Sequence, residues 1–160
     1  MDVYILPHFV GSGTPTLDSK SKGAILGLTI DTTKEDISRA ILDSNNYDLR
    51  LNMDKLQQIG IPIEEIRAIG GGAKSEKWLQ LRANVLGKRV CTLKVSEAAS
   101  LGAAILAGVG IDIFTSPQEG ANQWVKINKI FEPDIKQHSQ YEERYQNYLK
   151  IYPTLKELIL

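Results

Sequence analysis

The chain has 160 residues, of which 42% are apolar and 24% charged, a balance typical of one soluble globular domain. Its 19 Lys and Arg residues match its 19 Asp and Glu residues, so neither nucleic acid nor an anionic membrane is an expected partner. The chain has one cysteine, a start without a basic segment, and no apolar run long enough to span a bilayer. These features predict a cytoplasmic protein.

The first residues predict a loop followed by a strand. Residues 1–23 are rich in Gly, Ser, Thr and Pro and are expected to form an irregular loop. The apolar run 24–30 predicts a short strand. A domain that opens on so long a loop is unusual, and we therefore expect a further segment upstream.

A long helix is predicted next. Thr32 and Glu35 have the spacing of a capping box, in which each side chain bonds the other residue's backbone N–H. The helix should run to about Gln58, because Gly60 and Pro62 stop it.

Strands and helices alternate over the remaining chain, which indicates an α/β fold. The predicted elements are strand 65–69, helix 75–86, strand 88–95, helix 97–108, a short helix from Pro117 and strand 124–131. Gly87 should end the first of these helices, and Ser96 and Ser116 should cap the next two. Helix 97–108 is small and apolar on nearly every side, so we expect it to be buried against a neighbour.

The C-terminal segment 138–160 is predicted to be a helix. Four tyrosines lie at i, i+4, i+7 and i+11 and therefore share one helix face, which is typical of core packing. These are Tyr141, Tyr145, Tyr148 and Tyr152. The two histidines, His8 and His138, are expected at the surface.

Three consecutive glycines, Gly70 to Gly72, follow the predicted strand 65–69 and suggest a phosphate-binding turn. A P-loop requires glycine directly before its lysine, and here Ala73 precedes Lys74. The spacing therefore excludes a P-loop lysine, and Lys74 is expected to point to solvent.

A dinucleotide fingerprint, Gly-x-Gly-x-x-Gly, is matched only in part. Gly70 and Gly72 fit its first two positions, but Ser75 occupies the third. Glu97 follows the next strand, where an acidic residue would bind a ribose. A nucleotide-cofactor oxidoreductase therefore remains an alternative.

The backbone alone supports a wider interpretation. Glycines between a strand and a helix allow a ligand to approach the backbone N–H groups, and a helix N-terminus favours an anion. Ser75 would then either cap its own helix or donate its hydroxyl to the ligand. These residues predict a nucleotide-binding turn without identifying the nucleotide.

Four segments in order resemble the FGGY family of carbohydrate kinases. They are "LPHFVGSGTP" (6–15), "GAILGLTIDTTKEDISRAILD" (23–43), "GGGAKSEKWLQLRANVLGKRV" (70–90) and "EAASLGAAILAGVG" (97–110). The second resembles the family signature, the third its adenosine-binding turn and the fourth its Glu-x-x-x-Leu-Gly-Ala-Ala helix. Departures are Asn84, where the family often has Asp, and Asp43-Ser44, where Glu-Gly is common.

The resemblance implies a ribonuclease H-like or actin-like ATPase fold, of which residues 1–160 form the C-terminal, ATP-binding half. It implies ATP with Mg²⁺ as cofactors and a sugar held by an N-terminal domain that is absent here. The catalytic aspartate would lie in that domain, so we assign no catalytic or metal-binding residue. The aspartates Asp2, Asp18 and Asp31 are expected to be solvated loop residues.

Carried over to this sequence, the resemblance implies that Gly71 and Gly72 line the nucleotide at the ribose or α-phosphate. Ser75 would reach the same ligand, and Gly70 and Ala73 would shape the turn. Trp78 is expected to be a core residue rather than an adenine platform.

The main hypothesis is transfer of the ATP γ-phosphate to a sugar hydroxyl, with a pentulose such as xylulose as the favoured substrate because the motifs look xylulokinase-like. The isolated fragment is expected to be inactive. The alternatives are a nucleotide-sensing or split-kinase module and a dinucleotide-binding oxidoreductase domain. A homodimer is possible.

Overall fold

The computed structural model describes residues 3–159, and the chain divides into two compact units. The first comprises Met1–Ile63, Asn84–Gly87 and Asp134–Leu160, and the second comprises Glu64–Ala83 and Lys88–Pro133. Asp2, one of the predicted loop aspartates, lies outside the described residues. Each unit is described by itself below.

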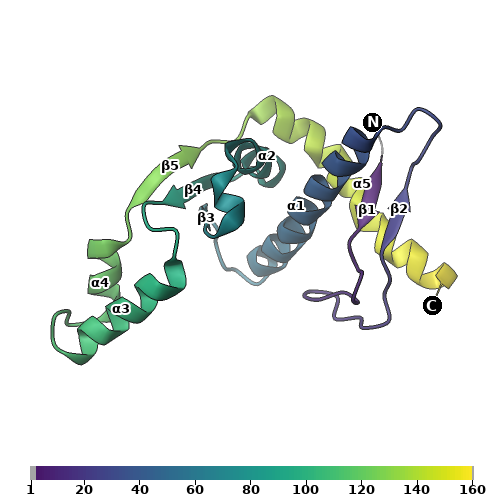
Figure 1. Ribbon diagram of the computed structural model, residues 1–160. Coiled ribbons are helices and arrows are strands. Elements are labelled where there is room, and N and C mark those ends of the chain that lie inside the picture. The colour runs from purple at the N-terminus through teal and green to yellow at the C-terminus, as the bar shows by residue number, and fades with distance from the viewer. Residues whose placement is uncertain (1–2, 160) are drawn as a thin grey trace. The chain divides into compact units, whose positions relative to one another are not determined.

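The first unit joins a two-stranded sheet to two long helices. Strands β1 (Tyr4–Leu6) and β2 (Ala24–Leu26) pair antiparallel, and helices α1 (Lys34–Gln58) and α5 (Ile135–Ile159) both contact β1 (Figure 1). The expectation of an irregular loop over 1–23 was wrong for β1. Three residues carry little periodicity, and the strand depends on pairing with a segment some 20 residues away.

The cap of α1 lies one residue later than predicted. Thr33, not Thr32, accepts the Asp36 N–H at 3.2 Å, and the Asp36 carboxylate accepts the Thr33 N–H at 2.9 Å. The Thr32 hydroxyl instead accepts the Thr29 N–H at 2.8 Å in the preceding turn. Both registers have the capping-box spacing, and the tight turn at Thr29 decides between them.

Helix α5 begins three residues before the predicted position 138, and its tyrosine stripe is confirmed as core. Tyr141, Tyr145 and Tyr148 are buried, and Tyr152 is partly buried. The Tyr145 hydroxyl donates to Asp54 at 2.6 Å, so the stripe binds α5 to α1. The expected surface position of His8 was wrong, because only 7% of this residue is exposed.

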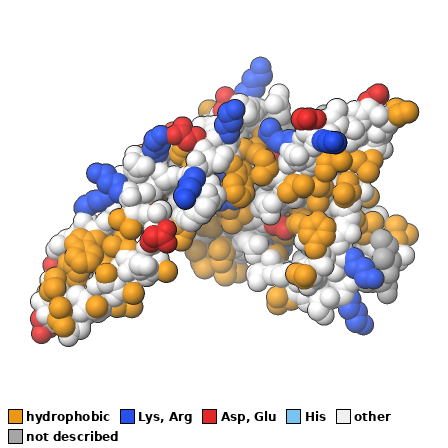
Figure 2. Space-filling view, in the orientation of Figure 1, with side chains coloured by type: hydrophobic (Ala, Val, Ile, Leu, Met, Phe, Trp, Pro, Cys, Tyr) orange, Lys and Arg blue, Asp and Glu red, His pale blue; other side chains and the backbone are white. Residues whose placement is uncertain are grey.

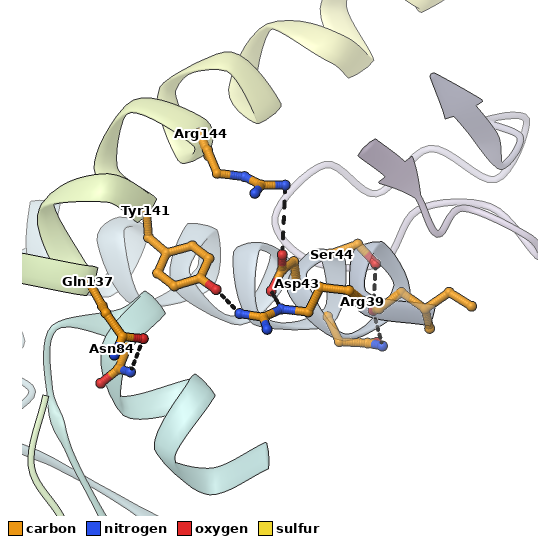
Figure 3. A network of polar contacts seen from close by, with 9 residues as sticks. Arg39, Asp43, Ser44, Asn84, Gln137, Tyr141 and Arg144 are labelled. Atoms are coloured by element: carbon orange, nitrogen blue, oxygen red, sulfur yellow. Dashed lines mark hydrogen bonds and ion pairs between the residues drawn. The ribbon is translucent and has the colours of Figure 1, made fainter. Parts of the chain in front are cut away.

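The residues that depart from the family signature serve packing between helices (Figure 3). Asp43 is 2% exposed; Arg39 donates to its Oδ1 at 3.0 Å, and Arg144 lies 3.8 Å from its Oδ2. Arg39 also donates to the Tyr141 hydroxyl. Burial raises the pKa of Asp43, although the two guanidinium groups act in the opposite direction. These contacts join α1 to α5, as expected for a structural role.

Asn84, near the end of α2 (Glu76–Leu86), is the second departure. Its Oδ1 accepts the Asp134 N–H at 2.9 Å, and its Nδ2 donates to Gln137 at 3.0 Å. The residue therefore fixes the first turn of α5. Gly87 follows the helix at φ +61°, the left-handed conformation expected of a C-terminal glycine cap.

The second unit is built on a three-stranded sheet in the order β3-β4-β5. Strand β3 (Glu65–Ala68) pairs parallel with β4 (Arg89–Leu93), which pairs antiparallel with β5 (Ile127–Phe131). Helix α2 follows β3 and packs on the sheet. The shared core consists of Ala68, Leu79, Ala83, Val90 and Phe131.

Helix α3 (Ala98–Gly110) differs from its prediction. Only Ile105 and Gly108 are buried, and Leu106 is 62% exposed. Figure 2 shows hydrophobic side chains gathered at the surface over α3 and α4. Within the described residues of this unit, α3 contacts mainly α4, which is too short to cover its small apolar faces.

The predicted caps of α3 and α4 had different outcomes. Ser96 does not cap α3: Glu97 stands at the cap position without a side-chain bond, and the Ser96 hydroxyl donates to the Glu97 carboxylate. Ser116 does cap α4 (Pro117–Trp124), since its hydroxyl accepts the Glu119 N–H at 3.2 Å.

Candidate nucleotide-binding turn

The predicted site residues lie together in the connection between β3 and α2. The connection is not a direct strand-to-helix junction, because a four-residue 3₁₀ turn, Gly71–Lys74, precedes α2. Gly70 enters the turn at φ +74° and ψ −160°, a conformation that is essentially restricted to glycine. The Ala73 N–H then bonds the Gly70 carbonyl at 3.1 Å and closes the turn.

Gly71 is an open position of the turn. A Cβ built on it would meet no atom within 4 Å, and the residue is exposed. The first N–H groups of a helical turn have no partner inside that turn. The backbone at Gly71 is therefore accessible to a ligand, as the predicted nucleotide-binding turn requires.

Gly72 has a different reason to be glycine. A Cβ at this position would lie 2.7 Å from Cζ3 of the Trp78 ring, well inside van der Waals contact. Trp78 itself is partly buried, and the guanidinium carbon of Arg82 lies 4.9 Å from the centroid of its ring. The Trp78 ring thus packs against the turn at Gly72, which agrees with a packing role.

Ala73, Lys74 and Ser75 complete the turn. Ala73 packs against the core between α2 and the sheet, and Lys74 is exposed as predicted. The Ser75 hydroxyl accepts the Trp78 N–H at 3.4 Å, so Ser75 caps α2. Its O–H hydrogen can still be donated to a ligand.

Sequence reasoning placed all five predicted residues in one turn but missed the contact between Gly72 and Trp78. The available signal was weak: Trp78 and Arg82 have the i, i+4 spacing that places side chains on one helix face. The ring's contact with the glycine backbone depends on how the 3₁₀ turn folds back over α2.

The single cysteine of the chain also lies in this unit. Cys91 is buried on β4, and burial raises the pKa of its thiol, so the thiolate is disfavoured. Among residues 3–159, no three His, Cys, Asp or Glu side chains are arranged to hold a metal ion. Over the same residues, no helix has both the length and the apolar character needed to cross a membrane.

Comparison with known proteins identifies the class to which this fold and turn belong. Residues 1–111 match the model of the C-terminal domain of the FGGY family of carbohydrate kinases. The chain therefore belongs to the FGGY family, and the predicted family is confirmed.

Individual relatives agree with this assignment. The chain is 35% identical over 152 residues to a xylulose kinase from Staphylococcus epidermidis, covering 95% of this chain and 31% of the relative. It is 40% identical over 139 residues to a glycerol kinase from Saccharolobus islandicus, covering 86% and 28%. The chain thus spans about a third of the length of these relatives.

A solved structure confirms the fold. The ligand-bound xylulose kinase from Lactobacillus acidophilus superposes with a TM-score of 0.88 at 25% identity, over 96% of this chain and 31% of that protein. The α/β, actin-like ATPase fold predicted for the chain is confirmed by this match.

Proposed function

We propose that this chain is the ATP-binding domain of a carbohydrate kinase that transfers the γ-phosphate of ATP to a sugar hydroxyl. The observation that carries the proposal is the Gly70–Ser75 turn, with an open backbone at Gly71, in a chain of the FGGY family. In this role Gly70 and Ala73 shape the turn, and Gly71, Gly72 and Ser75 face the ribose or α-phosphate. Positioning and charge neutralisation dominate phosphoryl transfer, so a nucleotide cradle is one necessary part of the site.

We propose a pentulose such as xylulose as the sugar. Support comes from the xylulose kinase relative, whose similarity extends over nearly the whole chain. The glycerol kinase relative has higher identity over a shorter part, so a triol is the competing substrate class.

Magnesium fits this chain less well than the nucleotide does. The turn from Gly70 to Ser75 carries no carboxylate, and Mg²⁺ prefers carboxylate, phosphate and water oxygens. We therefore assign no residue of the chain to Mg²⁺ and propose that it accompanies the phosphates of ATP.

The proposal is tested by calorimetric titration of the 160-residue chain with ADP and, separately, with NAD. We expect weak ADP binding, with a Kd of about 1 mM, and no NAD binding. Gly71→Val should weaken ADP binding at least tenfold, because its Cβ enters the open space beside the backbone that the ligand would approach.

Two results would contradict the proposal. Selective NAD binding would favour the oxidoreductase alternative, and unchanged ADP affinity in Gly71→Val would remove the turn from the binding site. Glu65→Gln, on the preceding strand, serves as the control: its partner Arg67 is exposed, so fold and ADP binding should both persist.

A further inference from the structure

A cavity in the first unit has no part in the nucleotide site. Its volume is about 240 Å³, below the roughly 300–1,000 Å³ of clefts for drug-sized ligands. His8 and Asp48 supply polar groups to its wall, and Tyr148 and Tyr152 supply aromatic rings. Leucines and prolines form most of the remaining surface. We refer to it as the His8 cavity.

The polar wall is held in place by partners behind it. The Nδ1 atom of buried His8 lies 2.6 Å from the Ser21 hydroxyl, and its ring packs edge-on against Tyr152 with centroids 5.4 Å apart. The Tyr148 hydroxyl donates to Asp48 Oδ1 at 2.5 Å, and the Tyr152 hydroxyl donates to Asp18 at 2.6 Å. A wall fixed in this way loses little conformational entropy when a ligand binds.

His8 and Asp48 each keep a second polar atom for a ligand. Within residues 3–159, His8 Nε2 and Asp48 Oδ2 have no hydrogen-bond partner. Burial lowers the pKa of His8, so the ring is neutral near pH 7 and offers a single Nε2 donor or acceptor. Asp48 Oδ2 accepts hydrogen bonds.

The charges near the cavity narrow the class of ligand. An anion would meet the Asp48 carboxylate, and a cation would meet the Lys55 ammonium, which also lines the cavity. A purely apolar ligand would leave His8 and Asp48 without hydrogen bonds, at a cost in free energy.

We propose that the His8 cavity binds a small neutral polyol. Its hydroxyl groups pair with Asp48 Oδ2 and His8 Nε2, and its C–H groups pack on the tyrosine and leucine side chains. This site lies in a different unit from the Gly70–Ser75 turn and does not depend on the proposed function.

The test is NMR titration of the 160-residue chain with xylitol, followed at the ring signals of its two histidines. We expect a saturable shift of the His8 signals with a Kd of about 1 mM, and no shift of comparable size from choline or inorganic phosphate. Absence of saturation, or an equal response to choline or phosphate, would overturn the proposal.

Variants locate the binding. His8→Tyr enlarges the side chain and removes Nε2, and because it also removes the His8 signals, its xylitol binding is followed by calorimetry. Asp48→Asn keeps the shape and Oδ1 but replaces an acceptor with a donor. Each should raise the Kd for xylitol at least tenfold, whereas Glu65→Gln in the other unit should not. If His8→Tyr does not fold, the test rests on Asp48→Asn. An unchanged Kd for xylitol in Asp48→Asn would contradict binding in the His8 cavity.

Discussion

At the scale of single residues, each of the three adjacent glycines suits its position for a different physical reason. Gly70 needs a backbone conformation closed to other residues, Gly71 borders open space, and Gly72 lies against the Trp78 ring. Only the second reason points directly to a ligand. Loss of nucleotide binding on substitution at Gly72 would therefore be ambiguous, whereas a loss at Gly71 would not.

We predict that Gly72→Ala lowers the free energy of unfolding by about 1–3 kcal/mol, because the new methyl group overlaps the Trp78 ring. Urea denaturation measures the change. Gly71→Ala is the matched control and should stay within about 0.5 kcal/mol of the wild type.

A double-mutant cycle identifies the cause. If Trp78 causes the loss, Gly72→Ala should cost markedly less in a Trp78→Leu background than alone. Additive losses would show that the ring is not responsible.

At the scale of elements, the start of α5 depends on one buried amide. The Asn84 side chain accepts the Asp134 N–H and donates to Gln137, while the backbone carbonyl oxygen of Asn84 lies 2.9 Å from His138 Nδ1. A helix N-terminus requires partners for its first N–H groups, and here one is supplied by the end of another helix.

We predict that Asn84→Ala lowers the free energy of unfolding by about 1–3 kcal/mol, because buried polar groups lose their partners. Asn84→Asp keeps the acceptor for the Asp134 N–H and should therefore lose less stability. Denaturation midpoints of the two variants provide the comparison, and equal losses would argue against the capping role.

The N-terminal loop is attached to α5 through Asp18, which is not the simple solvated carboxylate that was expected. The Tyr152 hydroxyl, followed by the Lys20 N–H, lowers the pKa of Asp18 from 3.8 to about 2. Asp31, by contrast, is exposed in a turn as expected.

We predict a stability contribution from Asp18 that is present above pH 4 and is lost as the pH falls through about 2. The sign follows because the unfolded chain binds this proton more readily than the folded one. Urea midpoints between pH 5 and pH 2 should fall more steeply in the wild type than in Asp18→Asn. Parallel curves would mean that Asp18 does not contribute.

At the scale of the whole molecule, the chain covers about 31% of its xylulose kinase relative. Within residues 3–159 we propose a nucleotide-binding turn and name no catalytic base.

We predict that the purified 160-residue chain releases no ADP above background when ATP and Mg²⁺ are supplied with xylulose or glycerol. A transfer site requires the sugar, the base and the phosphates to be positioned together. A coupled ADP-release assay measures this, with a full-length xylulose kinase as the positive control. Sugar-dependent turnover by the chain alone would contradict the prediction.

The sequence by itself determined the features that repeat or that depend on local chemistry. Helical periodicity placed α1 and α5 and the buried face of the tyrosines, and glycine spacing placed the turn while excluding a P-loop lysine. Ser116 was recognised as a cap because its bonds span three residues. Family membership followed from the order of several such segments.

Only the tertiary structure decided what depends on contacts between distant segments. Strand β1 exists through pairing with β2, and His8 is buried by contacts with Tyr152 and Ser21. Burial and close approach are properties of the packed chain, and local spacing does not encode them.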